Sequence, residues 1–542
     1  MRAHDAGADG SAAMTRSGAG DGVGRRLRPA LPSPAGVGRL PGEVAVDPVA
    51  PLVEDPRRLA PPRAAPGPRG FRGPGRGATS YIAAPPEWRG TTVQVCGLWP
   101  FSAGSGSPMV GVPVGRHLIT ASTVCCDPIS WFTRAKLIAN PSLFVLGRPG
   151  LGKSSLVRRM CLGLIAQGVI PLILGDLKPD YVDLVRAVGG QVVRIGRGVG
   201  GLNPLDPGGL RAAVSLLSGR ARDELTAEMH GRQVVVTAGL VELVRRARLA
   251  DHEQAALAAA IAVLNGVTDG DRVPVLADLV QVLRDGPDQV RTAVWDRGDD
   301  AEYERLIDPL LRSLTAVASG AFGEVFAGTG ATSRLMLDAP AVCMDTSSIA
   351  DTDERLQAAV LLACWSHGFG SILATQALAD AGQRPGRIYL AVLDELWRVL
   401  RAGEGLVDRI DGVTRLNRQQ GLGQIMVTHT MKDLDSLPAL EDRMKARGFV
   451  ERAGAVALAG LSEAEMGSLR DVVHLSHVEE RMITEWATPP AWDSTRGVEA
   501  DPPGLGKFLI KVGGRPGIPF QVRLTASERV LHDTNRRWGP AR

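Results

Sequence analysis

The chain has 542 residues, 44% of them hydrophobic, and a formal net charge of +4. This length predicts two to four domains with a true hydrophobic core, and so mild a charge does not by itself indicate a nucleic-acid-binding protein. The six cysteines form no Cys-x-x-Cys pair and accompany no histidine cluster, which argues against a zinc or disulfide framework and favours a reducing cytosol.

Residues 1–85 are rich in glycine, proline, alanine and arginine and show no sustained periodicity, so we expect a disordered tail. Its arginines could contact anionic lipid or DNA, although a solvated tail is the simpler interpretation. The start of the chain lacks the apolar core of a signal peptide. The longest apolar stretch singled out, residues 255–267, is shorter than the ~18–20 residues that span a bilayer. We therefore expect no transmembrane segment.

Order is expected to begin with the β-branched run at 91–96, followed by short strands at 109–112 and 117–121. The segment 143–160 then predicts a buried strand, a glycine-rich loop and a helix. Its loop fits the phosphate-binding pattern G-x-x-x-x-G-K-[ST] with Gly147, Arg148, Pro149, Gly150, Leu151, Gly152, Lys153 and Ser154. A chance match in a glycine-rich chain is the alternative, against which the strand and helix flanks argue.

The chemistry of this loop follows from its residue types. Glycines let consecutive N–H groups face an anion, and the N-terminus of the helix adds positive potential. We expect these eight residues and Ser155 to bind ATP, with Lys153 at the β- and γ-phosphates and the Ser154 hydroxyl on Mg²⁺.

Strands are expected next at 169–174 and 191–195, and a strand at 339–344 precedes an apolar helix at 355–365. Between these regions the spacing is helical, with helices expected at 211–217, 237–250, 252–265, 276–284 and 303–318. The pattern predicts an α/β fold with a mostly parallel sheet and a helical insertion. We divide the chain into the tail (1–85), the first part of the core with the phosphate loop (86–206), the insertion (207–335) and the second part of the core (336–542).

Acidic residues follow the apolar strand expected at 388–393. Asp394 suits the metal side of a nucleotide site, and Glu395 suits the orientation of an attacking water. A further strand within 423–430 ends in Thr428 and His429, and the carboxyl ends of parallel strands share one edge of a sheet. Thr428 or His429 is therefore a candidate sensor of the γ-phosphate, with a purely structural histidine as the alternative.

Four blocks in order support a family resemblance: the phosphate loop, LGDLKPDYVDLV with Gly189–Gly190 and 202–206, LDELW at 393–397, and TRLNRQQGLGQIMVTHTMKD at 414–433. Together they resemble the ATPases that energise conjugative type IV secretion systems, the TraC-like branch of the HerA–FtsK superfamily. The resemblance covers roughly residues 91–538. It departs at His429, where the family commonly has glutamine, and in the absence of a long folded N-terminal domain before the loop.

The resemblance implies a RecA-like motor domain that works as a hexameric ring and hydrolyses ATP with Mg²⁺. It assigns nucleotide and metal roles to Lys153 and Ser154, a metal role to Asp394 and the catalytic role to Glu395. It implies a homo-oligomeric protein that is cytoplasmic or peripheral at the inner face of the cell membrane. Channel proteins of a secretion or conjugation apparatus are the expected partners, and DNA is a possible one.

The C-terminal block 506–524 predicts two strands joined by a turn, followed by a helix at 526–538. An arginine finger from a neighbouring subunit could come from Arg415, the favoured candidate, or from Arg418 or Arg515, and each is otherwise a surface arginine. The alternatives to a secretion motor are a DNA translocase or coupling protein of the same superfamily, a small-molecule kinase, and a nucleotide switch without catalysis.

Overall fold

The computed structural model describes residues 108–267, 272–328, 332–403, 405–414, 421–437, 439–490, 492–493, 498–499 and 501–531. The predictions for the tail at 1–85, for the strand at 91–96 and for Arg415 and Arg418 therefore lie outside the described residues. The closing helix expected at 526–538 is described only as α19 (Ala526–Leu531).

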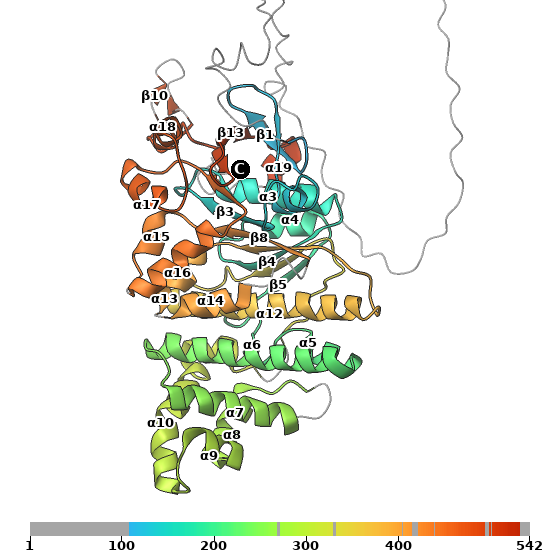
Figure 1. Ribbon diagram of the computed structural model, residues 1–542, viewed down its shortest axis with the longest axis vertical. Coiled ribbons are helices and arrows are strands. Elements are labelled where there is room, and N and C mark those ends of the chain that lie inside the picture. Colours follow the sequence, from blue (N-terminus) through green and yellow to red (C-terminus); the bar gives the residue numbers. More distant parts are fainter. Residues whose placement is uncertain are drawn as a thin grey trace, which may run out of the picture. The chain divides into compact units, whose positions relative to one another are not determined.

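A sheet of eleven strands organises the described part of the chain (Figure 1). In spatial order its strands are β2 (Thr123–Cys125), β1 (Pro113–His117), β13 (Ile518–Val522), β12 (Lys507–Lys511), β9 (Ala455–Leu458), β3 (Ser142–Leu146), β8 (Leu422–Val427), β7 (Tyr389–Leu393), β4 (Ile170–Asp176), β6 (Val342–Asp345) and β5 (Gln191–Arg194). From β9 to β5 all neighbouring strands are parallel, and the four pairs from β2 to β9 are antiparallel. The predicted α/β fold with a mostly parallel sheet is confirmed.

The central strands are apolar on both faces because helices cover both. In β3 the side chains of Leu143 and Val145 join one core, whereas Phe144 and Leu146 join the other. Successive side chains of a strand point to opposite faces, so a continuous apolar run fits a strand buried on both sides. The first core contains α2 (Pro128–Thr133), α3 (Lys153–Ile165) and α4 (Val182–Ala187).

The second core is built around α12 (Glu354–Asp380), which packs on β4. The other helices on this side are α13 (Leu396–Ala402), α14 (Leu406–Thr414), α15 (Met431–Asp435), α16 (Leu440–Glu451), α17 (Met466–Arg470) and α18 (His477–Trp486). By length and composition α12 could cross a membrane, but 94% of its apolar window is buried inside the protein. Among the described helices, α12, and not the segment 255–267, is the one that is long and apolar enough to span a bilayer. The helix expected at 355–365 continues to Asp380.

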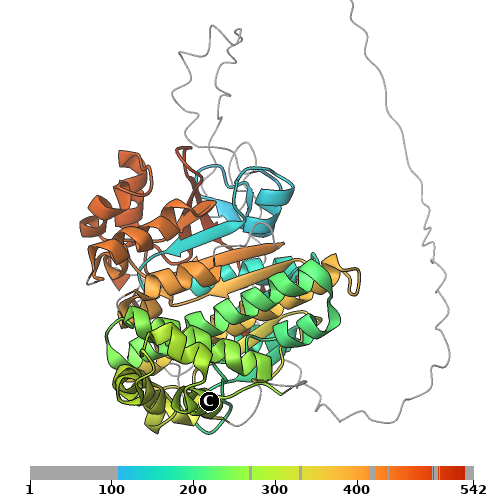
Figure 2. The same cartoon turned by 60° about the horizontal axis from the view of Figure 1, so that its bottom comes forward.

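Helices α5 to α11 lie between β5 and β6 in the chain (Figure 2). They are α5 (Leu210–Leu216), α6 (Gly219–Arg245), α7 (Asp251–Val267), α8 (Leu276–Asp285), α9 (Asp288–Val294), α10 (Asp300–Val317) and α11 (Gly320–Phe326). The long helix α6 packs against α12, so the second core continues from the sheet into these helices.

Two details of the sequence prediction for this region are wrong. The helix expected at 237–250 is α6, which begins at Gly219. Its start was not predicted because its first turns are charged and hide the apolar period. It ends at Arg245, since Arg246 adopts a left-handed conformation with φ of 60°. Helices α9 and α11 were not expected, and each has only seven residues.

The strands expected at 109–112 and 117–121 are also wrong, because β1 lies between them. The backbone N–H of Val112 donates to the Asp127 carboxylate at 3.0 Å instead of joining a strand. After β1, the N–H groups of Ile119 and Thr120 donate to Nδ1 of His117, each at 3.2 Å, and the chain turns into β2.

Candidate nucleotide-binding site

The phosphate-loop motif forms the connection between β3 and α3, as its sequence predicts. Gly152 adopts φ of 92° and ψ of 26° immediately before α3 begins at Lys153, a left-handed conformation that glycine adopts readily. Gly147 is required for a different reason, because a Cβ atom there would lie 2.4 Å from the methyl carbon of Ala459 after β9. The loop is thus packed against the end of the neighbouring strand and leads directly into a helix N-terminus, where anions bind.

Neighbouring strand ends also hold the loop by hydrogen bonds. The N–H of Gly147 donates to the carbonyl oxygen of His429 at 2.9 Å, and the N–H of Arg148 donates to that of Gly460 at 3.1 Å. The Arg148 guanidinium also donates to the Ala487 carbonyl at 2.8 Å. These contacts fix one side of the loop and leave Pro149 and Gly150 at its exposed tip.

The Lys153 side chain is buried and folds back over the loop. Its Nζ donates to the carbonyl oxygens of Gly147 at 2.6 Å and Arg148 at 3.2 Å, and it lies 3.0 Å from Nδ1 of His429. Burial lowers the pKa of Lys153 to about 8, against the opposing effect of the nearby Asp394 and Glu395 carboxylates. Among the described residues no carboxylate lies within ion-pair distance of this ammonium, so its charge is available to an anionic ligand.

The order of the strands explains why distant residues meet here. The strand β8 lies between β3 and β7, so His429 after β8 stands between Lys153 and Glu395. The strand β4 flanks β7 on the other side, so Lys178 after β4 approaches Glu395 from there. All four chain segments leave the sheet at its carboxyl edge, where ligands bind in open parallel sheets.

Glu395 is buried and is surrounded by hydrogen-bond donors. Its Oε1 accepts from Nζ of Lys178 at 2.6 Å, and its Oε2 accepts from the Trp397 indole and lies 3.1 Å from Nε2 of His429. Burial raises the pKa of Glu395, but the hydrogen bonds from His429 and Lys178 and the charge of Lys178 outweigh it and hold the pKa well below its usual value. Glu395 has φ of 54°, an uncommon conformation for a residue with a side chain, and it directly precedes α13.

Asp394 has different partners from Glu395 and is near enough to Asp176 for their charges to interact. It accepts hydrogen bonds from the Tyr181 hydroxyl and the Glu395 N–H, each at 2.8 Å. Burial, followed by the charge of Glu395, raises the pKa of Asp394 to about 6. At the end of β4, Asp176 accepts from the N–H groups of Asp180 and Tyr181, and burial raises its pKa to about 7.

Ser154 and Ser155 occupy the first turn of α3, and both are half-buried. The Thr428 hydroxyl is buried beside β3 and has no hydrogen-bond partner among the described residues. Within the described ranges no three or more histidine, cysteine or acidic residues are grouped to hold a metal ion alone. Mg²⁺ in nucleotide sites is commonly held by one or two protein ligands together with phosphate oxygens and water.

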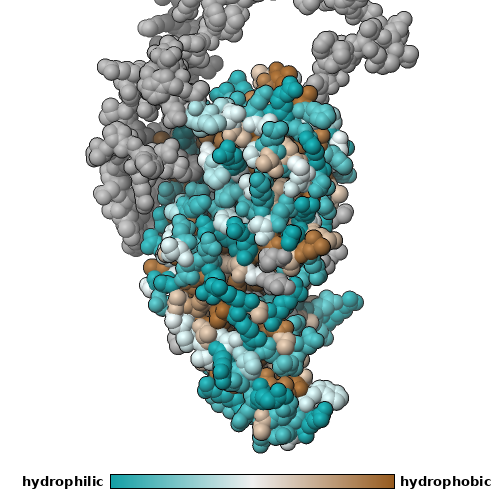
Figure 3. Space-filling view, turned by 90° about the vertical axis from the view of Figure 1, so that its left-hand side faces the viewer, coloured by the Kyte–Doolittle hydropathy of each residue, from teal (hydrophilic) through white to brown (hydrophobic). Residues whose placement is uncertain are grey.

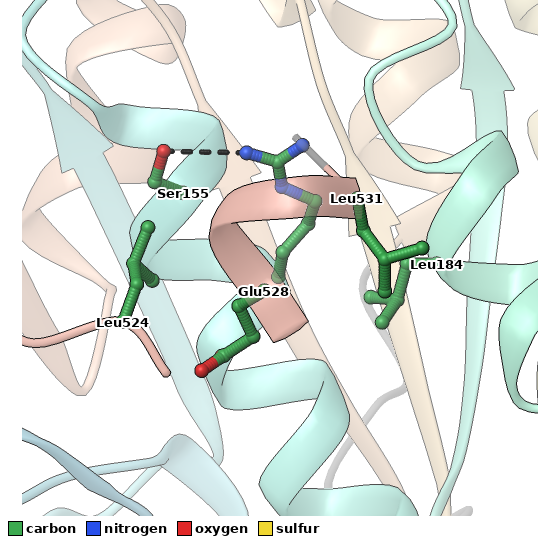
Figure 4. A pocket seen from close by; sticks show the side chains of 6 residues that line it. Ser155, Leu184, Leu524, Glu528 and Leu531 are labelled. Carbon is green, nitrogen blue, oxygen red and sulfur yellow. Dashed lines mark hydrogen bonds between the residues drawn. The ribbon is translucent and has the colours of Figure 1, made fainter. Parts of the chain in front are cut away.

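A small hollow, with room for about 20 Å³, lies beside the phosphate-loop helix (Figure 4). Ser155 borders it, and the guanidinium of Arg158 donates to the Ser155 hydroxyl at 3.2 Å, the contact drawn as a dashed line. The other lining residues come from α4 and from the C-terminal segment: Leu184, Leu524, Glu528 and Leu531. The hollow is therefore mainly apolar and adjoins the end of the loop.

The structure brings together Lys153, His429, Asp394 and Glu395, the residues proposed from the sequence. It places Arg515 in the turn between β12 and β13, where its carbonyl oxygen accepts from Lys511. Sequence reasoning missed Lys178, Tyr181 and Trp397 as members of this cluster. All three lie just beyond predicted strands, within the blocks DLKPDY and LDELW, so their position at strand ends was the available signal.

The loop leading to α3 and the order β9-β3-β8-β7-β4 define the RecA-like fold of P-loop nucleoside triphosphatases. No family model and no curated protein matches this chain by sequence. Among solved structures it is similar to VirB4 of Thermoanaerobacter pseudethanolicus, with a TM-score of 0.57 and 18% identity over 78% of this chain and 100% of that one. This likeness confirms, at the level of the fold, the resemblance noted in the sequence.

Looser matches are to the plasmid coupling protein TrwB. In complex with ADP and Mg²⁺ it matches with a TM-score of 0.44 and 14% identity, over 78% of this chain and 97% of that one. In complex with the non-hydrolysable ATP analogue ADPNP it matches with the same score and identity, over 71% and 85%.

Proposed function

We propose that this protein is a Mg²⁺-dependent ATPase of the RecA-like motor class, which energises conjugative DNA transfer or type IV secretion. The observation that carries the proposal is the junction of Lys153, His429 and Glu395 at one sheet edge, beside a loop that ends in a helix N-terminus. A structural site would not require a buried ammonium without a carboxylate partner.

In this proposal each residue has one task. The loop residues Gly147 to Ser155 bind the phosphates, and Lys153 neutralises the β- and γ-phosphates. Ser154 and Asp394 would hold Mg²⁺, which when bound neutralises charge on the phosphate oxygens. Glu395 orients and polarises the attacking water.

The division into a tail (1–85), a core in two parts (86–206 and 336–542) and an insertion (207–335) is part of the proposal. So is a cytoplasmic location, peripheral at the inner face of the cell membrane, with channel proteins and DNA as partners. The face in Figure 3 is largely hydrophilic and its hydrophobic residues are scattered, so a partner that bound there would meet a mainly polar surface.

The first test separates binding from turnover. Glu395→Gln should keep affinity for Mg-ATP within about threefold and lower kcat by about 10²–10³, because the amide still fits but no longer polarises water. Isothermal titration and a phosphate-release assay measure the two effects. The matched control is Glu302→Gln, since Glu302 also accepts from a basic side chain, that of Arg305, but on the exposed surface of α10. Unchanged kcat in the Glu395 variant would refute the assigned catalytic role.

A ring requires that neighbouring subunits complete the site. We expect ATPase activity per subunit to rise with protein concentration, measured alongside mass by sedimentation. Mixing Arg415→Ala with Glu395→Gln subunits should restore part of the turnover that each variant lacks, because a mixed interface pairs an intact glutamate with an intact arginine. Equal activity per subunit in monomer and oligomer would contradict the ring and favour a monomeric phosphotransferase.

A further inference from the structure

The carboxylate of Glu395 is held on both of its oxygens. Lys178 donates to Oε1 at 2.6 Å, while Trp397 and His429 share Oε2. A carboxylate offers about four lone-pair positions, so three are filled and the two on Oε2 are both filled. A water could reach this group only at one position of Oε1, beside the ammonium of Lys178. As arranged here, Glu395 is poorly placed to polarise a water.

The phosphate lysine is held by the same histidine. An ammonium has only hydrogens to offer, so Nδ1 of His429, 3.0 Å from Nζ of Lys153, must be the acceptor. The hydrogen of the neutral ring is then on Nε2, which lies 3.1 Å from Oε2 of Glu395 and donates to it. One imidazole therefore links the lysine of the phosphate loop to the carboxylate after β7, and each contact favours the tautomer that the other needs.

We propose that His429 and Lys178 hold Glu395 in a resting arrangement, and that a γ-phosphate reaching Lys153 releases it. This inference rests on the proposed function and concerns the regulation of the same site. A phosphate oxygen competes with Nδ1 for the hydrogens of Lys153. Once Nδ1 has lost its donor, the imidazole can turn toward the phosphate and withdraw Nε2 from Glu395.

Lys178 is the second positioning residue of this arrangement. Its side chain is 49% exposed, whereas that of Glu395 is 9% exposed, so Lys178 can move away without opening the core. Its contact with Oε1 holds the carboxylate from the side opposite the phosphate loop. A nucleoside diphosphate offers Lys153 only its β-phosphate, which can take a hydrogen that now binds the Gly147 or Arg148 carbonyl and leave the histidine contact intact. The additional γ-phosphate must also take the hydrogen bound to Nδ1, so the two nucleotides should differ in whether Glu395 is released.

The test uses Trp397, because its indole donates directly to Glu395. The full chain is labelled with 5-fluorotryptophan, and its Trp397 ¹⁹F resonance is assigned with Trp397→Phe. Spectra are recorded with Mg-ADP and with Mg-ADP plus beryllium fluoride, a γ-phosphate mimic, and nucleotide binding is measured on the same samples. We expect the Trp397 resonance to shift with beryllium fluoride and not with ADP alone. A bound mimic that leaves this resonance in place overturns the inference but not the proposed function, which this experiment contradicts if neither nucleotide binds.

Substitutions at His429 sharpen this test. A glutamine amide can accept from Lys153 through its oxygen and donate to Glu395 through its nitrogen, as the imidazole does. His429→Gln should therefore keep the beryllium fluoride response, while His429→Leu should lose at least four-fifths of the shift. Equal responses in the two variants would overturn the inference.

Lys178→Met keeps the inference falsifiable if His429→Leu does not fold, because the Lys178 side chain is half-exposed. We expect its Trp397 resonance to move toward the released position before any nucleotide is added, with KM for ATP within twofold of wild type and kcat changed at least threefold. The matched control is Lys445→Met, since Lys445 also contacts carboxylates at 2.6 Å, those of Asp408 and Glu441, on α14 and α16. The control should leave the resonance, KM and kcat unchanged, and a Lys178 variant that behaves like it refutes the arrangement.

Discussion

The helical insertion and the carboxyl edge of the sheet use charged side chains in opposite ways. In the insertion, Arg245 and Glu253 are only eight residues apart and join the end of α6 to the start of α7. At the sheet edge, Lys178 and Glu395 are 217 residues apart, and Lys153 and His429 are 276 apart. This pair in the insertion can thus form locally, whereas the candidate site exists only once the strands are in their final order. Loss of a charge should therefore affect stability in the insertion and ligand binding at the edge.

Lys153→Ala should produce the largest change in ATP binding. Removing the buried ammonium should weaken ATP binding at least ~100-fold, about 2.8 kcal/mol, because the phosphates lose their charged partner. The thermal midpoint should stay within about 2 °C of wild type, since alanine removes a desolvated charge together with its contacts. Calorimetric titration measures the ATP affinity, and thermal melting measures the midpoint. A variant with a much lower thermal midpoint but normal ATP affinity would show that Lys153 contributes to stability rather than to ligand binding.

Arg245→Ala tests whether the loss of a charge in the insertion lowers stability and leaves ligand binding unchanged. Arg245 donates twice to Glu253, at 2.6 and 2.8 Å, and also to Ser313 and to the carbonyl oxygen of Pro309. Its loss leaves the buried Glu253 without a cation, so we expect a free energy of unfolding lower by about 3 kcal/mol. ATP affinity of the folded protein should not change.

The matched control for Arg245 is Arg312→Ala, because the exposed pair of Arg312 and Asp308 should contribute less than about 0.5 kcal/mol. Denaturant unfolding of both variants measures the two losses of free energy of unfolding. Equal destabilisation by the two substitutions would show that burial of the acid is not what makes the Arg245 contact important.

Glu479→Gln asks whether a contact between distant segments can be purely structural. Glu479, in the first turn of α18, accepts from Lys511 of β12 and from the N–H of Gly517 before β13. Burial raises the pKa of Glu479, but the N–H groups of Ser476 and Gly517 and the ammonium of Lys511 outweigh it, so the pKa is lowered from 4.5. We expect a loss of about 2 kcal/mol at pH 7 with ATP affinity unchanged.

The pH dependence of this loss follows from the lowered pKa. The contribution of Glu479 is present above the pKa of the unfolded chain and disappears as the carboxylate is protonated in the folded protein. The difference between wild type and variant should therefore shrink as the pH falls below about 4.5, the ordinary value. Unfolding curves at several pH values measure it. A difference that is constant with pH would show that packing, rather than charge, is lost.

What the sequence predicted follows the same division between local and distant contacts. The loop at 147–154, the acids after β7 and the histidine after β8 were found because each is a short pattern next to an apolar run. The ion pair of Lys178 with Glu395 was not predicted, because it depends on β4 lying next to β7. Local sequence patterns do not predict the order of strands in a sheet. The start of α6 was missed for a local reason, since its charged first turns carry no apolar period.

The burial of α12 also has a consequence for how the protein is made. This apolar 27-residue helix is complete at Asp380, yet α13 and α14, which pack against it, are synthesised later. While the chain leaves the ribosome, the surface of α12 that they will cover faces water, which favours aggregation of the partly folded chain. We therefore expect the yield of soluble protein during translation, rather than the stability of the finished fold, to depend most on chaperones that shield a long hydrophobic helix.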